Sequence, residues 1–349
     1  MKKRILIAPL NWGLGHATRC IPIINALLKY DFEPILASDG NALAFLRKEF
    51  PNLEYIELPS YNITYPRNGS FKWHFLKKSP SILSSIKKEQ KVISSLVDSR
   101  RIDGIISDNR FGVFSKKIPS VYITHQLNVH SGSTSWISSK FHRRKIHRFD
   151  ECWVPDTINS SLSGELSNSK NIKIKVKYIG HLSRFKKETL ETEYDLLVLL
   201  SGPEPQRGIL ENLLLEQLNN FEGNIAFVKG VIEDKQTKVV NENMTTYNYL
   251  NSFELNEVIN KSALLLSRSG YSTIMDLARL GKKVFFIPTP GQYEQEYLAN
   301  HLKSKNIAPF ATQKDFKIQS LRTAENYKGF DQIAFEELPK NLFGLFESK

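Results

Sequence analysis

The sequence predicts an α/β protein of two domains, each built around a parallel sheet. Its 349 residues suffice for two domains of ordinary size, and 41% of them are apolar. Short apolar strands alternate with helical patterns along most of the chain, which is typical of parallel sheets covered on both faces. We expect a first domain at 1–182, a second at 183–330, and a C-terminal helix at 331–349 that packs back on the first.

The chain opens with a strand, a glycine loop and a helix. The apolar stretch that starts at Ile5 leads to Gly13 and Gly15, which let the backbone turn sharply. Thr18 stands where a dinucleotide fingerprint needs its third glycine, so a nicotinamide site is not expected. The helix that follows is predicted to bury one face, formed by Cys20, Ile23, Ile24, Leu27 and Leu28.

His16 lies at the mouth of this glycine loop. In a parallel sheet such a loop occupies the carboxyl end of its strand, where ligands bind. We therefore predict that His16 is a general base that takes a proton from an acceptor hydroxyl, and that Gly15 contacts the same acceptor. The alternative is a histidine that only hydrogen-bonds the loop backbone.

Two polar clusters follow later strands of the first domain. Asp108 either orients His16 or merely starts the turn that continues with Asn109 and Arg110. We expect these residues, and the second cluster, to contact a hydroxyl-bearing acceptor, because buried hydroxyls need matched donors and acceptors. The second cluster consists of His125, Gln126 and Asn128. The strands are expected at Glu33–Ser38, Leu53–Leu58, Asp103–Asp108, Ser120–His125 and Glu151–Pro155.

Aromatic and basic residues are interleaved between Tyr61 and Lys91. They are Phe71, Lys72, Trp73, Phe75, Leu76, Lys77, Lys78, Lys87, Lys88 and Lys91. We predict a helical lid with solvated lysines, and the alternative is a surface that touches anionic lipid. A second basic run occupies residues 140–148.

The formal net charge of +12 suits nucleic acid, an anionic membrane surface or a phosphorylated substrate. No apolar run is long enough for a signal peptide or a membrane-spanning helix, so we expect a cytoplasmic protein with at most peripheral contact at the inner membrane face. Cys20 and Cys152 fit neither a disulfide framework nor a zinc site. No cofactor or bound metal is expected.

The second domain contains a turn that is typical of an anion site. Arg268, Ser269, Gly270, Tyr271 and Ser272 follow an apolar strand and open a helix, whose N–H groups, hydroxyls and dipole are predicted to hold a diphosphate. The alternative is a plain helix cap. The strands are expected at Asp195–Leu200, Asn224–Val228, Thr245–Tyr249, Ala263–Ser267 and Val284–Pro288.

Three further features complete the predicted donor site. Asp276 on the polar face of the helix can accept hydrogen bonds from ribose hydroxyls, and Ser201-Gly202 forms a second phosphate-compatible turn. Glu294 and Gln295 can bond sugar hydroxyls. The sequence contains no Asp-x-Asp, so helix ends and basic side chains are expected to stabilise a diphosphate leaving group.

Ser267-Arg268-Ser269-Gly270 with Asp276 resembles the diphosphate turn and ribose-binding acid of GT-B glycosyltransferases related to the peptidoglycan lipid-linked N-acetylglucosaminyltransferase, family 28. His125-Gln126-Leu127-Asn128 is similar to the acceptor-side motif of that group. The pattern Gly13-Leu14-Gly15-His16-x-x-Arg19-Cys20 looks closer to the nucleotide-sugar hydrolases of pseudaminic acid synthesis. The resemblance implies GT-B architecture, with two Rossmann-like parallel-sheet domains facing a central cleft.

Together these features predict an inverting, metal-independent glycosyltransferase. We expect it to move a hexosyl or N-acetylhexosaminyl group from a nucleotide-sugar donor, a UDP-sugar, to a hydroxyl of a sugar, glycolipid or lipid-phosphate acceptor. One alternative is a nucleotide-sugar hydrolase that releases free sugar and UDP. A more remote one is a basic, non-enzymatic nucleic-acid-binding protein, which the scattered lysines and the lack of a recognition motif disfavour.

Overall fold

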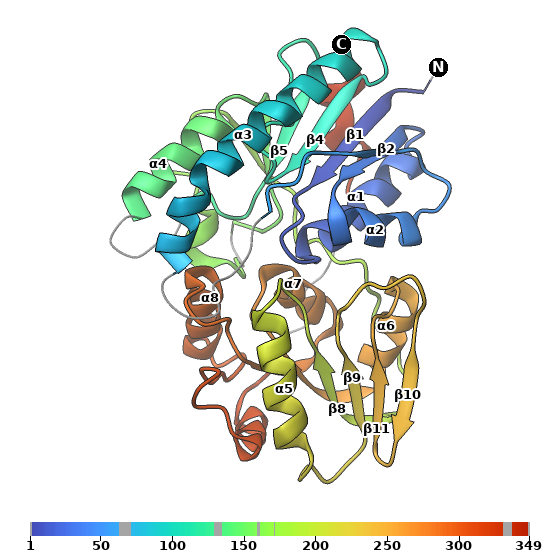
Figure 1. Cartoon of the computed structure of the whole chain (residues 1–349), viewed down its shortest axis with the longest axis vertical. Coiled ribbons are helices and arrows are strands. Elements are labelled where there is room, and N and C mark those ends of the chain that lie inside the picture. The colour runs from blue at the N-terminus through green and yellow to red at the C-terminus, as the bar shows by residue number, and fades with distance from the viewer. Residues whose placement is uncertain are drawn as a thin grey trace. The chain divides into compact units, whose positions relative to one another are not determined.

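The computed structural model describes residues 2–62, 71–128, 135–158, 161–170, 172–330 and 337–347, without the side chains of residues 71–79, 135–138 and 141. This part of the chain divides into two compact units (Figure 1). The first unit contains the described residues up to Ser183 together with residues 337–347, and the second begins at Arg184.

The first unit is built on a sheet in which every described strand pairing is parallel. The strand order is β3-β2-β1-β4-β5-β6-β7, so the chain first builds outward from β1 on one side and then on the other. The strands are β1 (Arg4–Pro9), β2 (Glu33–Ser38), β3 (Tyr55–Glu57), β4 (Gly104–Asp108), β5 (Ser120–Ile123), β6 (Glu151–Val154) and β7 (Lys175–Tyr178).

Helices connect these strands and supply the apolar faces that cover the sheet. In α1, Cys20, Ile23, Ile24 and Leu27 are fully buried as predicted, whereas Leu28 is 44% exposed. Leu28 lies about 80° around the helix from Cys20 and so stands at the edge of the buried face. The connecting helices are α1 (Gly15–Lys29), α2 (Gly40–Glu49), α3 (Phe71–Asp98), α4 (Ser135–Ile146) and the short 3₁₀ helix η1 (Gly164–Ser167).

The C-terminal segment 337–347 packs on the first unit. The rings of Phe343 and Phe346 are buried and contact Phe32 and Trp153. The C-terminal helix was expected over 331–349; within the described residues 337–347 it is interrupted at its start, because Pro339 keeps an extended backbone. Helical structure is confined to η3 (Lys340–Phe343) and α9 (Gly344–Glu347).

The second unit has a sheet of order β10-β11-β9-β8-β12-β13, parallel except for the β10–β11 pair. The β10 strand was not predicted, since all four of its side chains are exposed and show no buried alternation. The strands are β8 (Tyr194–Leu199), β9 (Ile225–Val228), β10 (Lys238–Asn241), β11 (Met244–Tyr247), β12 (Ser262–Ser267) and β13 (Lys283–Phe286). The helices are α5 (Gln206–Leu218), α6 (Ser252–Asn260), α7 (Tyr271–Leu280), α8 (Tyr293–Ser304) and η2 (Ile318–Asn326).

Each sheet contains a point where the strand order reverses direction. In the first unit it lies between β1 and β4, whose last residues Pro9 and Asp108 are paired. In the second unit it lies between β8 and β12, where Leu199 pairs with Ser267. Ligands of open α/β sheets bind at the carboxyl ends of strands at such points. The topology therefore selects the loops after these four strands as candidate sites.

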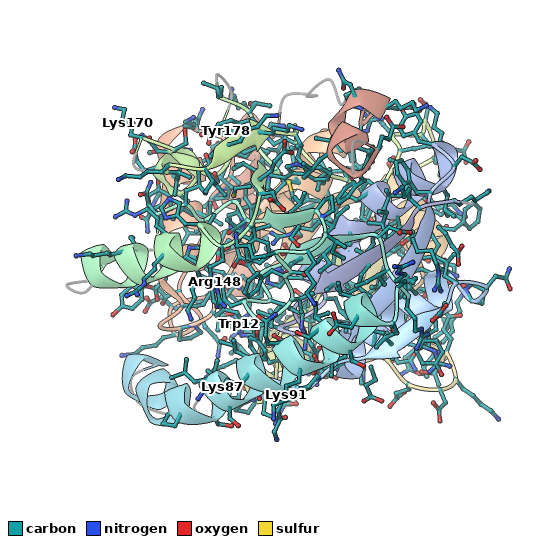
Figure 2. The ribbon with its side chains drawn as sticks, turned by 90° about the horizontal axis from the view of Figure 1, so that it is seen from above. Trp12, Lys87, Lys91, Arg148, Lys170 and Tyr178 are labelled. Atoms are coloured by element: carbon teal, nitrogen blue, oxygen red, sulfur yellow. The ribbon has the colours of Figure 1, made fainter. Side chains whose placement is uncertain are left out.

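The basic surface of α3 is only partly described. Lys87, Lys88 and Lys91 are exposed, and Figure 2 shows Lys87 and Lys91 on this helix. The remaining lysines and the aromatic side chains of the predicted lid, at 71–78, lie outside the described side chains. Among the described residues no helix combines the length and apolarity needed to cross a membrane.

Candidate functional site

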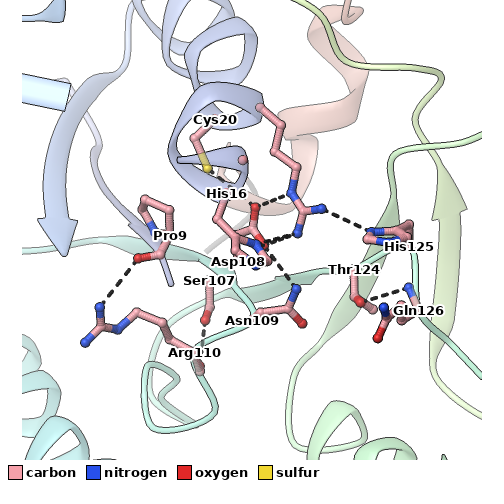
Figure 3. A network of polar contacts seen from close by, with 12 residues as sticks. Pro9, His16, Cys20, Ser107, Asp108, Asn109, Arg110, Thr124, His125 and Gln126 are labelled. Carbon is pink, nitrogen blue, oxygen red and sulfur yellow. Dashed lines mark hydrogen bonds and ion pairs between the residues drawn. The ribbon is translucent and has the colours of Figure 1, made fainter. Parts of the chain in front are cut away.

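His16 and Asp108 meet at the switch point of the first unit (Figure 3). His16 is the second residue of α1 and Asp108 is the last residue of β4. Because β1 and β4 are neighbours, these two residues are brought together across 92 positions of sequence, and Nδ1 of His16 lies 2.8 Å from Oδ1 of Asp108. The imidazole is 14% exposed and the carboxylate is fully buried. The structure thus places Asp108 where it can orient His16.

Arg19 joins this pair from the next turn of α1. Its Nε and Nη2 atoms donate to the two carboxylate oxygens of Asp108. Its Nη2 also lies 2.9 Å from Nδ1 of His16, and its Nη1 lies 3.1 Å from Nδ1 of His125. Arg19 and Asp108 are both buried, so the two charges compensate each other in a region of low dielectric constant.

The surroundings keep the imidazole of His16 neutral and Asp108 ionised at neutral pH. Burial lowers the pKa of His16; the Asp108 anion opposes this effect, and the Arg19 cation adds to it. For Asp108, burial acts to raise the pKa, but the Arg19 cation and the bond to His16 outweigh it and lower the pKa to about 2. A neutral imidazole is the form that accepts a proton.

His125 is bound to the same arginine. A guanidinium group only donates hydrogen bonds, so Nδ1 of His125 accepts from Arg19 and Nε2 carries the ring hydrogen. Gln126 beside it is half-buried, and its backbone N–H donates to the hydroxyl of Thr124. His125 therefore joins His16 and Asp108 in one network, with Gln126 at its edge.

Asn128 braces a neighbouring loop. Its side-chain Nδ2 donates to the backbone carbonyls of Glu165 and Asn168, at 3.0 and 2.9 Å. Both hydrogens of this amide group are used within the protein, so an acceptor contact is left to its carbonyl oxygen. Asn128 therefore links the segment after β5 to the segment around η1.

The predicted acceptor contact of Arg110 is wrong. This side chain is fully buried, and it donates to Glu89, to Asp39 at 2.6 Å and to the carbonyl of Pro59 at 2.7 Å. Its charge is compensated by two buried carboxylates, and no face is left for a ligand. Asn109 is half-buried with φ of 60° and accepts from the hydroxyl of Tyr122 at 2.8 Å.

In the second unit, the side chain of Arg268 is also bonded within the protein, contrary to the prediction that it contacts the donor. It is almost fully buried, and its guanidinium donates to four acceptors within 3.1 Å. These acceptors are the backbone carbonyls of Gln206, Ile287 and Pro288 and the side-chain oxygen of Gln313. Arg268 thereby ties the loops after β8, β12 and β13 together.

The hydroxyl of Ser269 likewise does not face a ligand. Ser269 is fully buried, and its Oγ donates to the backbone carbonyl of Gln295 at 2.8 Å. The side chain of Gln295 accepts from the backbone N–H of Thr289, so it shapes the loop as well. The hydroxyl of Ser269 is thus used within the protein, contrary to prediction, whereas the contact of Gln295 with a sugar stays a prediction.

The start of α7 keeps the properties of an anion site. Gly270 is the N-cap residue, and it makes no side-chain cap hydrogen bond. Tyr271 is buried with the apolar face of α7. The remaining predicted donor residues Ser201, Ser272, Asp276 and Glu294 are half-buried, and Gly202 is exposed. Within the described residues, no cluster of three His, Cys, Asp or Glu side chains could hold a metal ion.

Comparison with known proteins identifies the class of this site. Residues 209–326, which include α7, match the glycosyltransferase family 28 C-terminal domain. The glycotransferase of kitacinnamycin has the same fold, with a TM-score of 0.61 and 13% identity, and the alignment covers 93% of this chain and 89% of the other. The chain has the GT-B glycosyltransferase fold.

Other similar structures span nearly the whole chain. SnogD from Streptomyces nogalater has a TM-score of 0.58 and 13% identity, and covers 100% of this chain and 96% of its own. MurG from Acinetobacter baumannii has a TM-score of 0.51 and 13% identity, and the alignment covers 94% of this glycosyltransferase and 93% of MurG. At these identities the likeness establishes the fold alone.

Two curated relatives carry the same name, UDP-N-acetylglucosamine–N-acetylmuramyl-(pentapeptide) pyrophosphoryl-undecaprenol N-acetylglucosamine transferase. The protein from Haemophilus ducreyi is 21% identical over 344 residues, which cover 92% of this glycosyltransferase and 88% of the relative. The protein from Listeria monocytogenes is 22% identical over 324 residues, covering 87% and 84%.

Replacing Asp108 with asparagine is expected to destabilise the first unit and to weaken its acid response. The variant leaves Arg19 buried without a counter-charge, which costs about 3–5 kcal/mol in comparable pairs. The pKa of Asp108 is about 2 in the folded protein, against an ordinary value of 3.8. The charged carboxylate therefore stabilises the fold fully above pH 3.8, and this contribution is lost as the pH falls toward about 2. Urea unfolding at decreasing pH, followed by tryptophan fluorescence, measures both effects.

The fluorescence signal is specific, because all four tryptophans of the chain precede residue 184. Asp98→Asn is the matched control, since its exposed carboxylate pairs only with a surface lysine, Lys117, at 2.6 Å. Equal unfolding midpoints for Asp108→Asn and the parent across this pH range would contradict the charge pairing.

Proposed function

We propose that this GT-B glycosyltransferase is inverting and metal-independent, and that it transfers a sugar from a UDP-sugar to an acceptor hydroxyl with His16 as the general base. The observation that carries the proposal is the hydrogen bond between His16 and the buried Asp108. A base held by an ionised carboxylate is the arrangement that activates a hydroxyl for attack. A single displacement by that hydroxyl inverts the configuration at the sugar carbon.

The tautomer of His16 determines which ring nitrogen accepts the proton. An unprotonated Nδ1 would direct its lone pair at an anionic oxygen 2.8 Å away, whereas Nδ1–H donates a charge-assisted hydrogen bond to it. With the hydrogen on Nδ1, Nε2 is the proton acceptor, and Asp108 stabilises the imidazolium that forms. General-base catalysis of this kind contributes about 10²- to 10⁴-fold, or roughly 3–5 kcal/mol of barrier.

The donor is proposed to bind at the start of α7. Backbone N–H groups at Gly270, Tyr271 and Ser272 and the helix dipole, equivalent to about half a positive charge, suit the leaving diphosphate. Asp276, one turn further along α7, is assigned to the ribose hydroxyls. The support for this placement is the family 28 match over 209–326, together with the position of the turn at a strand switch point.

The acceptor is proposed to be a lipid-linked sugar. The curated relatives are named as transferases that act on a pyrophosphoryl-undecaprenol substrate with UDP-N-acetylglucosamine. On this chain, Nε2–H of His125 and the half-buried Gln126 are assigned to acceptor hydroxyls. The exposed Lys87, Lys88 and Lys91 of α3 suit an anionic membrane surface.

Replacing His16 with alanine is expected to lower turnover by about 10²- to 10⁴-fold, because the proton acceptor is lost. UDP affinity should stay nearly unchanged, since the nucleotide is assigned to the second unit. Steady-state turnover and calorimetric UDP binding measure the two quantities. His147→Ala is the control, a histidine of the same unit that accepts from the backbone of Lys173; parent-like turnover of His16→Ala would refute the base assignment.

Replacing Asp276 with alanine should have the opposite pattern, with UDP binding weakened by about tenfold or more. Hydrogen bonds to a charged carboxylate are worth about 1.5–3 kcal/mol, and the variant loses those to ribose. Asp315→Ala serves as the control, since that carboxylate accepts only a local bond from Thr312. Unchanged UDP affinity in Asp276→Ala would show that the ribose binds elsewhere.

A nucleotide-sugar hydrolase is the second candidate, favoured by the Gly-x-Gly-His loop and by the fact that a His–Asp pair activates water as well as an alcohol. Incubation with UDP-sugars, with and without a lipid-linked sugar acceptor, separates the two functions. A transferase releases UDP rapidly only with the acceptor and forms a larger glycolipid. Equal, stoichiometric release of free sugar in both samples would establish the hydrolase instead.

A further inference from the structure

The proposed mechanism leaves open the role of Arg19 in the His16 network. Its guanidinium holds both oxygens of Asp108, and the same Nη2 atom lies 2.9 Å from Nδ1 of His16. These contacts are all made by side chains that are buried or nearly so. The arginine is therefore placed to control both the carboxylate and the imidazole.

We propose that Arg19 is a positioning residue of this glycosyltransferase, which keeps Asp108 an anion aimed at Nδ1 of His16 and thereby keeps Nε2 available as the proton acceptor. The inference rests on the proposed function, because it concerns the same base. Arg19 itself transfers no proton and touches no substrate in this scheme.

The contacts around Nδ1 allow two arrangements, and only one leaves an active base. If Nδ1 carries hydrogen, it donates to Asp108, and Arg19 donates to the carboxylate and to His125 rather than to Nδ1. If Nδ1 accepts from Arg19, the hydrogen moves to Nε2 and the base is lost. The carboxylate concentrates its charge on two oxygens, whereas the guanidinium spreads its charge over three nitrogens. The nearer and more concentrated anion therefore favours hydrogen on Nδ1.

Without Arg19 this preference would reverse. A buried carboxylate with no cation beside it is stabilised by taking up a proton. The neutral acid would then donate its O–H to Nδ1 of His16, and the ring hydrogen would shift to Nε2. The bidentate contact of Arg19 prevents this step, since it supplies two donors and a positive charge to Asp108.

The groups that face the imidazole also predict how activity depends on pH. They are Asp108 at the end of β4, Arg19 on α1 and His125 after β5, while Cys20 faces the far carboxylate oxygen at 3.8 Å. Arg19 disfavours a second positive charge on His16. Loss of that cation should let the Asp108–His16 pair take up a proton at higher pH and so move the acid limb of the rate profile to higher pH.

The test compares the parent with Arg19→Gln and Arg19→Lys. Histidine labelled with ¹⁵N reports by NMR which ring nitrogen carries hydrogen, and the His16 signal is identified by its loss in His16→Asn. We expect Nδ1–H in the parent, and in Arg19→Gln a shift toward Nε2–H with an acid limb of kcat/KM raised by about one pH unit or more. UDP affinity should not change in either variant.

Arg19→Lys separates charge from geometry, because lysine keeps the cation but cannot pair with both oxygens. Its acid limb should stay close to that of the parent while kcat falls at least about tenfold. Arg148→Gln is the control for a general loss of an arginine in this unit, since that guanidinium lies over the ring of Phe114 at 4.0 Å. It should leave the acid limb unchanged.

The proposal is overturned by Nε2–H in the parent, or by parent-like tautomer and acid limb in Arg19→Gln. If Arg19→Gln does not fold, the parent tautomer and Arg19→Lys decide, and parent-like kcat in the lysine variant overturns it. The NMR titration is independent of turnover. An active His16→Ala would therefore refute the base role of His16 without affecting the measurement of what Arg19 does to the imidazole.

Discussion

The candidate site depends on one constraint, that a fully buried carboxylate at the end of β4 has to be compensated. Asp108 is surrounded by the sheet and by α1, so its charge is stable only because Arg19 and His16 reach it from consecutive turns of that helix. The same compensation orients the imidazole. Stability of the first unit and chemistry at its rim are therefore properties of one set of hydrogen bonds.

The parallel topology could be predicted from sequence because its signal is local. Apolar runs such as those at β1, β4 and β12 are buried on both faces, and each ends in small or polar residues that begin a turn. Once the strands alternate with helices, their carboxyl ends meet at a common edge, which brings His16 and Asp108 together. The exposed β10 strand has no such pattern and was missed for that reason.

The functions of the arginines could not be predicted, because a charge in the sequence does not reveal what surrounds it. Arg110 and Arg268 follow strands, next to polar or phosphate-compatible turns. An arginine in such a position can bind a ligand, or it can be buried and bonded within the protein. The structure compensates the first with Glu89 and Asp39 and the second with backbone carbonyls. In the sequence, Arg19 stood out only as part of the glycine-histidine motif. Its position three residues after His16 could have indicated the contact between them, because residues at this spacing share a helix face.

The two units are related to known proteins in different ways, and this bears on the chemistry. The family 28 match is confined to 209–326, the part that contains the start of α7 and Asp276, which we propose as the donor site. The first unit instead contains the His16–Asp108–Arg19 network, which in the proposed function activates a hydroxyl that reaches Nε2. In the proposed function, donor chemistry and acceptor choice therefore reside in separate sheets. The difference between transfer and hydrolysis lies in which oxygen the first unit admits to that imidazole, because the base treats water and an alcohol alike.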